Sequence, residues 1–307
     1  MLSSMNRSLP TASSHRKRLA VALPVLIGGV FLLAMLAVAV FDVSCCPCGR
    51  EAPAAGGKVD LMQLEEYQGQ PSWRIETPAA TYVYHRDGAG FASLIDPDGK
   101  DWISFRTTGG SDGPYRGIPN IIHPEGGFHP GKDTCISRIV REDQSGVTIE
   151  SRTKDGRWAC RWEIGPRTAT VTIEKIGHPY WVLYEGTPGG AYDETKAFMV
   201  DSAGNRTPCT ERWERRLPDP RWIYFGTPDS NYVLFLIDRT ERKADTVDSF
   251  WSMQKNMTVF GFGRVLNSRD PRWKHLTETP ARVTVGLLPA AEHDRLAETL
   301  NALAVLK

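Results

Sequence analysis

Residues 146–185 read GVTIESRTKDGRWACRWEIGPRTATVTIEKIGHPYWVLYE, and this stretch decides the fold prediction. It contains four runs rich in β-branched and aromatic residues, which favour strands. Turn-forming residues separate these runs at residues 154–156 (KDG) and 177–179 (GHP). The run TATVTIEKI at residues 168–176 alternates strictly, as expected of a strand with one buried face. The stretch therefore predicts consecutive antiparallel strands joined by short turns.

Similar strand signals continue on both sides of this stretch. The turn at residues 96–99 (DPDG) predicts a hairpin between residues 90–95 and 100–105, because Pro suits its second position and Gly its fourth. Residues 290–305 predict a helix, with leucines on one stripe and acidic residues near the start. About a dozen short strands predict an all-β fold, a large antiparallel β-sandwich with a short C-terminal helix. The other predicted strands are residues 81–85, 222–225, 232–238, 257–263 and 282–287.

The N-terminus predicts a membrane segment. Residues 19–41 are 23 consecutive uncharged and mostly apolar residues. At about 1.5 Å per residue they can cross a hydrocarbon core of about 30 Å. Basic residues precede the run, so residues 1–18 are expected to be a cytoplasmic tail, and residues 42–58 a linker to an extracytoplasmic domain at 59–307. The run is either a signal anchor, placing the domain in the periplasm or at the cell surface, or a cleaved signal peptide of a secreted protein.

Composition and motifs exclude several classes of function. The formal net charge of the 307 residues is +1, and the aromatic residues are not interleaved with a basic patch, so nucleic acid is not an expected partner. The chain lacks a GxGxxG motif after a strand, a P-loop, a GxSxG and an HExxH motif, and no cofactor is expected. Cys135, Cys160 and Cys209 are odd in number, which allows one disulfide and one free thiol outside the cell.

Residues 113–131, reading GPYRGIPNIIHPEGGFHPG, concentrate unusual residues in one segment. Its glycines and prolines predict a long ordered loop rather than a helix or a central strand. One interpretation makes His123, Glu125 and His129 metal ligands, although their spacing matches no well-defined metal motif. A second interpretation is a structural loop whose polar side chains bind backbone groups.

The third interpretation of this segment is a sugar site. Elimination in a uronate needs a group that neutralises the carboxylate, a base for the neighbouring proton and an acid for the leaving oxygen. Arg116 and Asn120 suit the first role, His123 suits the base and Tyr115 suits the acid. His129 is a further candidate for substrate binding.

The stretch at residues 178–190, HPYWVLYEGTPGG, adds candidates on one strand. Alternation places Trp181 and Glu185 on one face and Tyr184 on the other. Glu185 is a candidate acid or base beside an apolar neighbour, or else an ordinary surface glutamate. His178 is a second candidate base, Tyr184 a second candidate acid, and Trp181 a candidate sugar-binding residue.

Residues 248–264, DSFWSMQKNMTVFGFGR, contain residue types found in sugar sites. Trp251 can stack on a sugar face, and Asn256 can bind hydroxyl groups. Gln254, Lys255 and Arg264 are of similar types. The alternation of Phe and Gly at the end of the stretch favours a packed strand instead.

The order of RWACRWEI, TATVTIEKI and YWVLYEGTPGG resembles the large β-sandwich of galactose-mutarotase-like and polysaccharide-lyase-associated domains. The segments YRGIPN and TVFGFGR also resemble segments of secreted bacterial proteins. The likeness covers residues 70–290 and implies a carbohydrate-related β-sandwich. The Asn-His-rich strand motif of mutarotases is missing, so the resemblance transfers no catalytic residue.

Together these observations predict a membrane-anchored, extracytoplasmic β-sandwich that acts on carbohydrate, with a lyase-type reaction on acidic polysaccharide. The alternative is a non-catalytic carbohydrate-binding or envelope-interaction module, and a metal enzyme is the third option. The enzyme requires that His123 and Arg116 face His178 and Glu185 across a cleft.

Overall fold

The computed structural model describes residues 57–108, 116–121, 127–267 and 269–305. The predicted cytoplasmic tail and anchor, and the linker up to residue 56, lie outside these ranges. Within them, no helix is long and apolar enough to cross a membrane.

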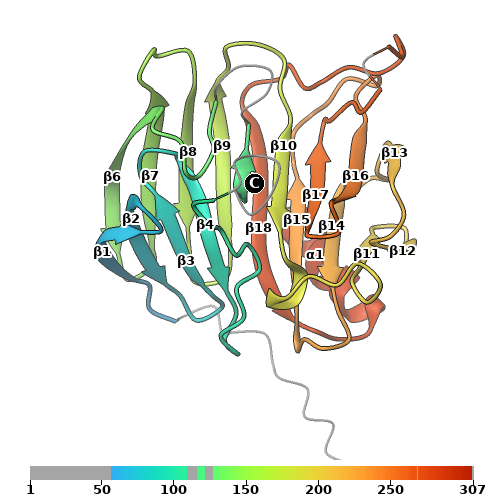
Figure 1. Cartoon of the computed structure of the whole chain (residues 1–307), viewed down its shortest axis with the longest axis horizontal. Helices are drawn as coiled ribbons and strands as arrows, with labels where there is room; N and C mark the ends of the chain where they lie inside the picture. The colour runs from blue at the N-terminus through green and yellow to red at the C-terminus, as the bar shows by residue number, and fades with distance from the viewer. Residues whose placement is uncertain (1–56, 109–115, 122–126, 268, 306–307) are drawn as a thin grey trace, which may run out of the picture. The chain divides into compact units, whose positions relative to one another are not determined.

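The described chain folds into two antiparallel nine-stranded sheets (Figure 1). The first sheet has the order β1-β2-β3-β4-β5-β10-β17-β16-β13, so the chain enters it four times and returns to it three times after the first visit. Its strands are β1 (Asp60–Tyr67), β2 (Gln70–Glu76), β3 (Thr81–His85), β4 (Gly90–Ile95), β5 (Gly117–Asn120), β10 (Val182–Gly186), β13 (Trp213–Arg215), β16 (Asp248–Met253) and β17 (Met257–Phe262).

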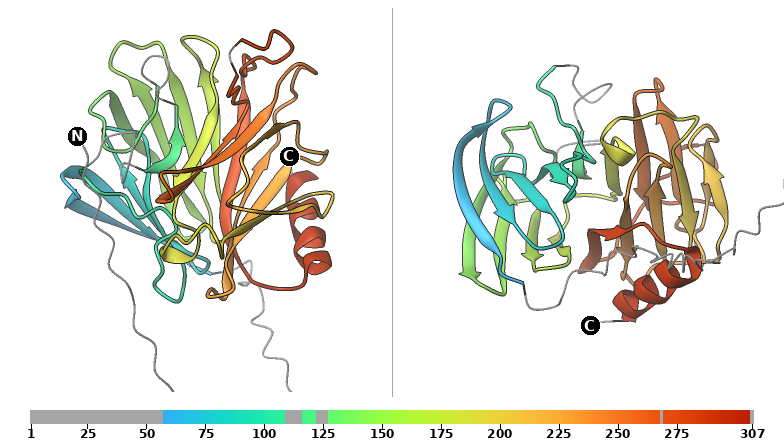
Figure 2. Two further views of the ribbon diagram at one scale, coloured as in Figure 1. Left: turned by 45° about the vertical axis from the view of Figure 1, so that its right-hand side comes forward. Right: turned by 90° about the horizontal axis from the view of Figure 1, so that it is seen from below.

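The second sheet has the order β12-β11-β14-β15-β18-β9-β8-β7-β6. Figure 2 shows it layered against the first sheet, with the single α-helix of the described chain on its outer face. Its strands are β6 (Cys135–Asp143), β7 (Gly146–Thr153), β8 (Ala159–Ile164), β9 (Ala169–Lys175), β11 (Phe198–Asp201), β12 (Arg206–Pro208), β14 (Trp222–Gly226), β15 (Tyr232–Asp238) and β18 (Ala281–Pro289). The all-β, β-sandwich prediction is confirmed.

Aromatic side chains fill the space between the sheets. The rings of Phe91 on β4 and Trp162 on β8 lie 4.4 Å apart between centroids, and both are fully buried. The hydroxyls of Tyr84 on β3 and Ser151 on β7 are hydrogen-bonded at 2.8 Å. The buried tyrosine hydroxyl is therefore satisfied inside an otherwise apolar layer.

The helix α1 (His293–Val305) covers the outer face of the second sheet. Leu296 and Leu300 pack there against strand residues that include Trp222, whose indole nitrogen donates to Asn301 Oδ1 at 2.8 Å. The predicted helix is confirmed, with a start three residues later than expected.

The hairpin predicted at residues 146–164 is confirmed as β7 and β8, and the alternating run at 168–176 forms β9. The strand predicted at residues 100–105 is wrong, because this segment makes only one isolated bridge, between Ile95 and Asp101. Asp101 Oδ1 accepts hydrogen bonds from the backbone N–H of Leu94 at 3.1 Å and of Ile103 at 3.0 Å. Backbone hydrogen bonds such as Trp102 N to Leu94 O at 2.9 Å remain, but the Asp101 side chain takes N–H groups that a regular ladder would use.

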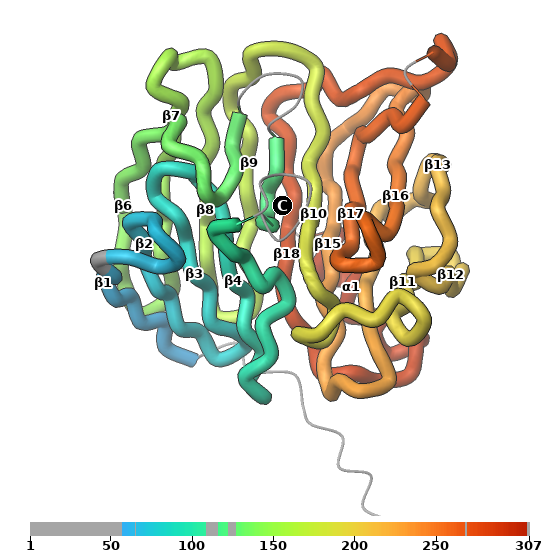
Figure 3. Tube along the Cα trace, in the orientation of Figure 1, coloured from blue at the N-terminus to red at the C-terminus, as the bar shows by residue number. Residues whose placement is uncertain are grey.

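The prediction that residues 113–131 contain no central strand is also wrong. Strand β5 lies between β4 and β10, in the middle of the first sheet (Figure 3). Its partners on β10 are Leu183 for Asn120 and Glu185 for Gly117, so the register shifts by one residue between these pairs. This bulge places Pro119 where a ladder hydrogen bond is already interrupted, which is how a sheet accepts proline.

The three described cysteines are buried free thiols. Burial raises the pKa of Cys135 to about 11, that of Cys209 to about 12 and that of Cys160 above its ordinary value. The disulfide that the sequence allowed is not formed among them.

Candidate functional site

The outer face of the first sheet carries the candidate site. On β10 and the residues before it, Tyr180, Val182 and Tyr184 belong to the core between the sheets. Trp181 and Leu183 belong to a separate apolar cluster, as the predicted alternation requires. Glu185 pairs with Val259, which in turn pairs with Trp251, so these three residues lie side by side across β10, β17 and β16.

Glu185 lies in a group of three buried polar side chains. The amide nitrogen of Asn120 donates to Glu185 Oε2, and His129 Nε2 lies 3.9 Å from the same oxygen. The exposed fraction of each side chain is small, 3% for Glu185, 1% for Asn120 and 0% for His129. Residues from two separate sequence segments therefore meet here because β5 pairs with β10.

Arg116, a candidate for carboxylate binding, donates hydrogen bonds to two other segments of the chain. Its Nη1 donates to Ser104 O at 2.8 Å, and its Nη2 donates to Asn256 O at 3.0 Å and to Asn256 Oδ1 at 3.4 Å. Burial lowers the pKa of this guanidinium. Arg116 and Asn256 therefore fasten the β16–β17 hairpin tip to the loop after β4.

The sequence predicts that Arg116 neutralises a sugar carboxylate. In the structure, Arg264 is placed beside the aromatic residues of the site. Its guanidinium carbon lies 4.1 Å from the ring centroid of Trp251 and 5.6 Å from that of Trp181. Burial lowers its pKa to about 10, while the negative charge of Glu185 opposes this shift. Its Nη1 atom is buried and has no hydrogen-bond partner within the described chain. The sequence identified Arg264 as one of the residue types found in sugar sites but predicted no role of its own for it.

Two glycines shape the backbone around Arg264. A Cβ on Gly261 would lie 2.8 Å from the Arg264 Cβ, so the arginine stem lies directly over this glycine. Gly263 has a φ of +70°, a conformation that other residues rarely adopt. The chain therefore turns back over β17 and carries Arg264 toward the two tryptophans.

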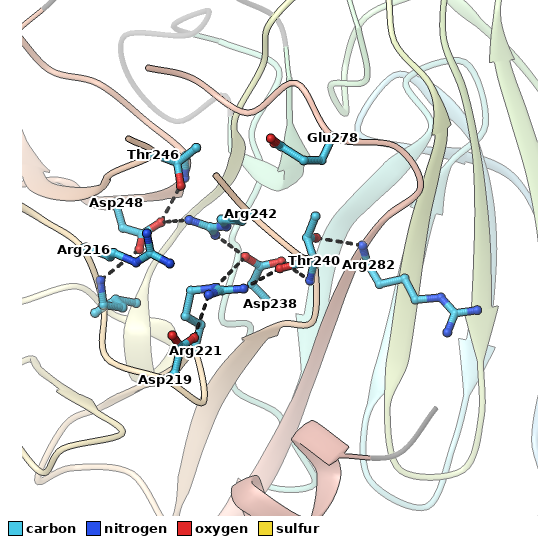
Figure 4. Close-up of polar contacts among 12 residues, drawn as sticks. Arg216, Asp219, Arg221, Asp238, Thr240, Arg242, Thr246, Asp248, Glu278 and Arg282 are labelled. Atoms are coloured by element: carbon cyan, nitrogen blue, oxygen red, sulfur yellow. Dashed lines mark hydrogen bonds and ion pairs between the residues drawn. The ribbon is translucent and has the colours of Figure 1, made fainter. Parts of the chain in front are cut away.

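A buried ion network fixes this turn (Figure 4). Arg242 forms ion pairs with Asp238 and, at 2.5 Å, with Asp248 Oδ1. The same Asp248 oxygen accepts the backbone N–H of Gly263 at 3.0 Å, and its Oδ2 accepts that of Leu217 at 3.1 Å. Paired charges and several hydrogen bonds are what make a buried carboxylate tolerable.

The other predicted catalytic residues lie apart from Glu185 or outside the described chain. Tyr184 is fully buried between the sheets and donates to Trp102 O at 2.7 Å, on the opposite side of the sheet from Glu185. His178 packs against Trp158 in the β9–β10 turn, with ring centroids 4.9 Å apart. Tyr115, His123 and Glu125 are not among the described residues, so of the four side chains expected to face one another across a cleft only Arg116, His178 and Glu185 are described.

Within the described ranges, no group of three or more His, Cys, Asp and Glu side chains could hold a metal ion. Two of the proposed ligands, at positions 123 and 125, lie outside those ranges.

No family model matches the chain, and no curated protein matches it. Solved structures do. A candidate mutarotase (YeaD) from Salmonella typhimurium is 12% identical with a TM-score of 0.50, over 76% of this chain and 94% of that chain. A candidate aldose 1-epimerase from Klebsiella pneumoniae is 9% identical with a TM-score of 0.48, over 80% and 87%. An α-N-acetylgalactosaminidase from Bifidobacterium bifidum is 14% identical with a TM-score of 0.47, over 75% and 38%.

At these identities the comparison concerns architecture. The likeness to the Salmonella protein shows that the domain has a galactose-mutarotase-like β-sandwich fold, as the sequence resemblance implied.

Proposed function

We propose that this protein acts on acidic carbohydrate at the outer face of the first sheet, through a lyase-type elimination. One observation carries the proposal: Arg264 lies against two tryptophans, has a buried nitrogen without a hydrogen-bond partner among the described residues, and is close enough to Glu185 for their charges to interact. A cation, a carboxylate and aromatic faces in one place are the groups that recognise an acidic sugar.

Arg264 would bind the acid group of the sugar. A buried guanidinium nitrogen without a hydrogen bond costs free energy, and a bound carboxylate or phosphate removes that cost. Such a contact also withdraws charge from the carboxylate, which makes the proton on the neighbouring carbon easier to remove. The tryptophans at 181 and 251 would contact the apolar faces of the sugar ring.

Glu185 would transfer the proton. It removes the hydrogen on the carbon next to the carboxyl group, and the electron pair of that C–H bond forms a C=C bond. The bond from the next carbon to the glycosidic oxygen then breaks, and the proton on Glu185 passes to that oxygen. Asn120 and His129 hold the Glu185 carboxyl group in one orientation.

The place of action is also a proposal. We infer from the apolar run at residues 19–41 and the basic residues before it that the domain lies outside the cytoplasm, held at the membrane. Protease treatment of intact cells would then digest a C-terminal tag, and treatment that leaves the tag intact until lysis would contradict this orientation.

A second candidate reaction is the mutarotation of an acidic sugar. The fold likeness favours it, and Glu185 would serve there as the group that moves the proton. A third outcome is binding without turnover, which the aromatic surface at Trp251 would allow.

The experiment compares the purified protein with two variants on a panel of uronate polysaccharides. We expect ultraviolet absorbance from an unsaturated uronate product, and a loss of rate of about 10²–10⁴-fold in Glu185→Gln, which removes the proton acceptor. Arg264→Gln should lose activity as well. Arg206→Gln is the matched control, because Arg206 also stacks on an aromatic ring, at 3.4 Å from Phe198, but in the second sheet.

The outcomes separate the candidates. Binding without an unsaturated product rejects the lyase. Exchange of anomers measured by NMR in the same samples would then assign mutarotation, and its absence would leave a binding module. If no polysaccharide or sugar acid of the panel binds, the carbohydrate proposal itself is rejected.

A further inference from the structure

Two arginine side chains, those of Arg264 and Arg212, lie near the ring of Trp251. The guanidinium carbon of Arg264 lies 4.1 Å from the centroid of this ring, and that of Arg212 lies 5.7 Å away. Arg212 directly precedes β13, which pairs with β16 and so lies beside Trp251. The two like charges repel, and the positive charge of Arg212 adds to the effect of burial in lowering the pKa of Arg264.

Neither arginine has a counter-ion among the residues that the structure describes. No described carboxylate forms an ion pair with either of them. The acidic groups nearby have other partners. Glu185, whose charge also acts on Arg264, accepts from the amide nitrogen of Asn120. Glu194 pairs with Lys255 at 3.6 Å, and Glu214 accepts the backbone N–H groups of residues 266 and 267. Two adjacent cations that form no ion pair with a described carboxylate are a site for more than one negative charge.

A cavity of about 760 Å³ opens on the Arg212 side of Trp251. Its volume is in the range of a small-molecule binding site. The β16–β17 hairpin tip forms part of its wall, and Gln254 and Lys255 there have positive φ angles of 51° and 56°. Both angles are those of the tight turn that joins the two strands, closed by the hydrogen bond from Asn256 N to Met253 O at 2.9 Å. The lining residues are Glu194, Thr210, Arg212, Trp251, Ser252, Met253, Gln254 and Lys255.

We propose that the ligand carries acid groups on two adjacent sugar units, one bound by Arg264 and the next bound by Arg212 in this cavity, with the Trp251 ring between them. The inference rests on the proposed function and narrows its substrate class. The expected substrate is a polysaccharide in which consecutive sugar units are acidic, rather than one in which acidic and neutral units alternate.

The charges that line the cavity support binding of a second acidic sugar unit there. Lys255 is neutralised by Glu194, so Arg212 is the cavity cation that remains for a ligand. A charge-assisted hydrogen bond to a carboxylate is worth about 1.5–3 kcal/mol, so a second acid group should tighten binding by about 10–100-fold. A neutral second unit would gain only contacts with the cavity wall.

Calorimetric titration of the full chain tests the proposal with three kinds of probe. These are single uronic acids, diuronic acids with an acid group on each unit, and a disaccharide of one uronic acid and one neutral sugar, each with galacturonate, mannuronate, guluronate and glucuronate as the acidic unit. The wild-type protein should bind a diuronic acid about 10–100-fold more tightly than the corresponding single acid or mixed disaccharide.

Variants at Arg212 identify the contact. Arg212→Gln should remove the advantage of the diuronic acid and leave affinity for the single acid within about twofold, since Arg264 is untouched. Arg212→Lys should restore part of the advantage, and Arg206→Gln should change neither affinity. Thermal melts of each variant confirm that the fold is kept.

Three results are decisive. Equal affinity for diuronic acids and mixed disaccharides in the wild-type protein overturns this inference while the proposed function stands. A loss of affinity in Arg212→Gln that is the same for single and double acids also overturns it. If no probe binds the wild-type protein, the proposed function fails, and the inference fails with it.

Discussion

Replacing Asp248 by asparagine tests whether the buried ion network holds the turn that carries Arg264. Asp248 uses both oxygens, since Oδ1 accepts from Arg242 Nη1 and from the Gly263 N–H, and Oδ2 accepts from the Leu217 N–H. Asparagine has one oxygen and one NH2 group, so in either orientation an NH2 faces at least one buried N–H. The variant also leaves Arg242 with Asp238 as its only described ion-pair partner.

The size of the effect follows from the burial of these charges. Asp248 and Asp238 are both fully buried on their side chains, and Arg242 is 1% exposed. Removing one partner of such a pair costs about 3–5 kcal/mol. We therefore expect urea unfolding at neutral pH to show a loss of this order in Asp248→Asn, with an unchanged m-value.

Two controls separate the causes. Asp219 also pairs with an arginine of this network, Arg221 at 2.6 Å, but its side chain is 67% exposed, so Asp219→Asn should cost at most about 1 kcal/mol. Asp238→Asn removes a buried charge without touching Gly263, and it should destabilise the protein while ligand binding at Arg264 is retained. Equal stability of Asp248→Asn and Asp219→Asn would refute the reasoning.

Two further predictions concern the site and the core. Gly261→Ala places a Cβ 2.4 Å from Leu183 Cδ2 and 2.8 Å from the Arg264 Cβ, so we expect a loss of about 1–3 kcal/mol and weaker binding of sugar acids in calorimetry. Gly165→Ala, where the nearest atoms lie 3.9 Å from the new Cβ, is the control for stability, and unchanged binding in Gly261→Ala would contradict the placement of Arg264. Burial lowers the pKa of His85 from 6.5 to about 4. The unfolded chain then binds the proton more readily, so this group should remove about 3 kcal/mol of stability as the pH falls from 6.5 to 4. His85→Leu should flatten that part of the stability curve measured by urea titration at several pH values, and an unchanged slope would exclude His85 as its source.

The face of the strand on which each candidate side chain lies could be predicted, because it depends only on the local sequence. Alternation along residues 180–185 was enough to place Trp181 and Glu185 on one face and Tyr184 on the other, because the side-chain period of a strand does not depend on its partners. The strands β7, β8 and β9 were predictable for the same reason.

Features that depend on a neighbouring strand could not be predicted in this way. Pro119 argues against a central strand, and only the bulge between β5 and β10 makes its place acceptable. Strand β1 reads DLMQLEEY, with acidic residues that do not favour a strand, and its pairing with β2 supplies the missing stabilisation. The register of β10, β17 and β16 brings Arg264 to the site, and the spacing of residues in the sequence does not reveal that register.

The return of the chain to the first sheet on three occasions has a consequence for the energetics of recognition. Asn120, Glu185 and Arg264 come from separate visits or from the turn that ends one, so no fragment that lacks one of these segments contains the complete site. A ligand that spans them can bind only the whole folded sheet. Saturation at about 100 times the dissociation constant would then raise the free energy of global unfolding by about 2.7 kcal/mol. Ligand occupancy would thereby protect distant strands from hydrogen exchange and proteolysis.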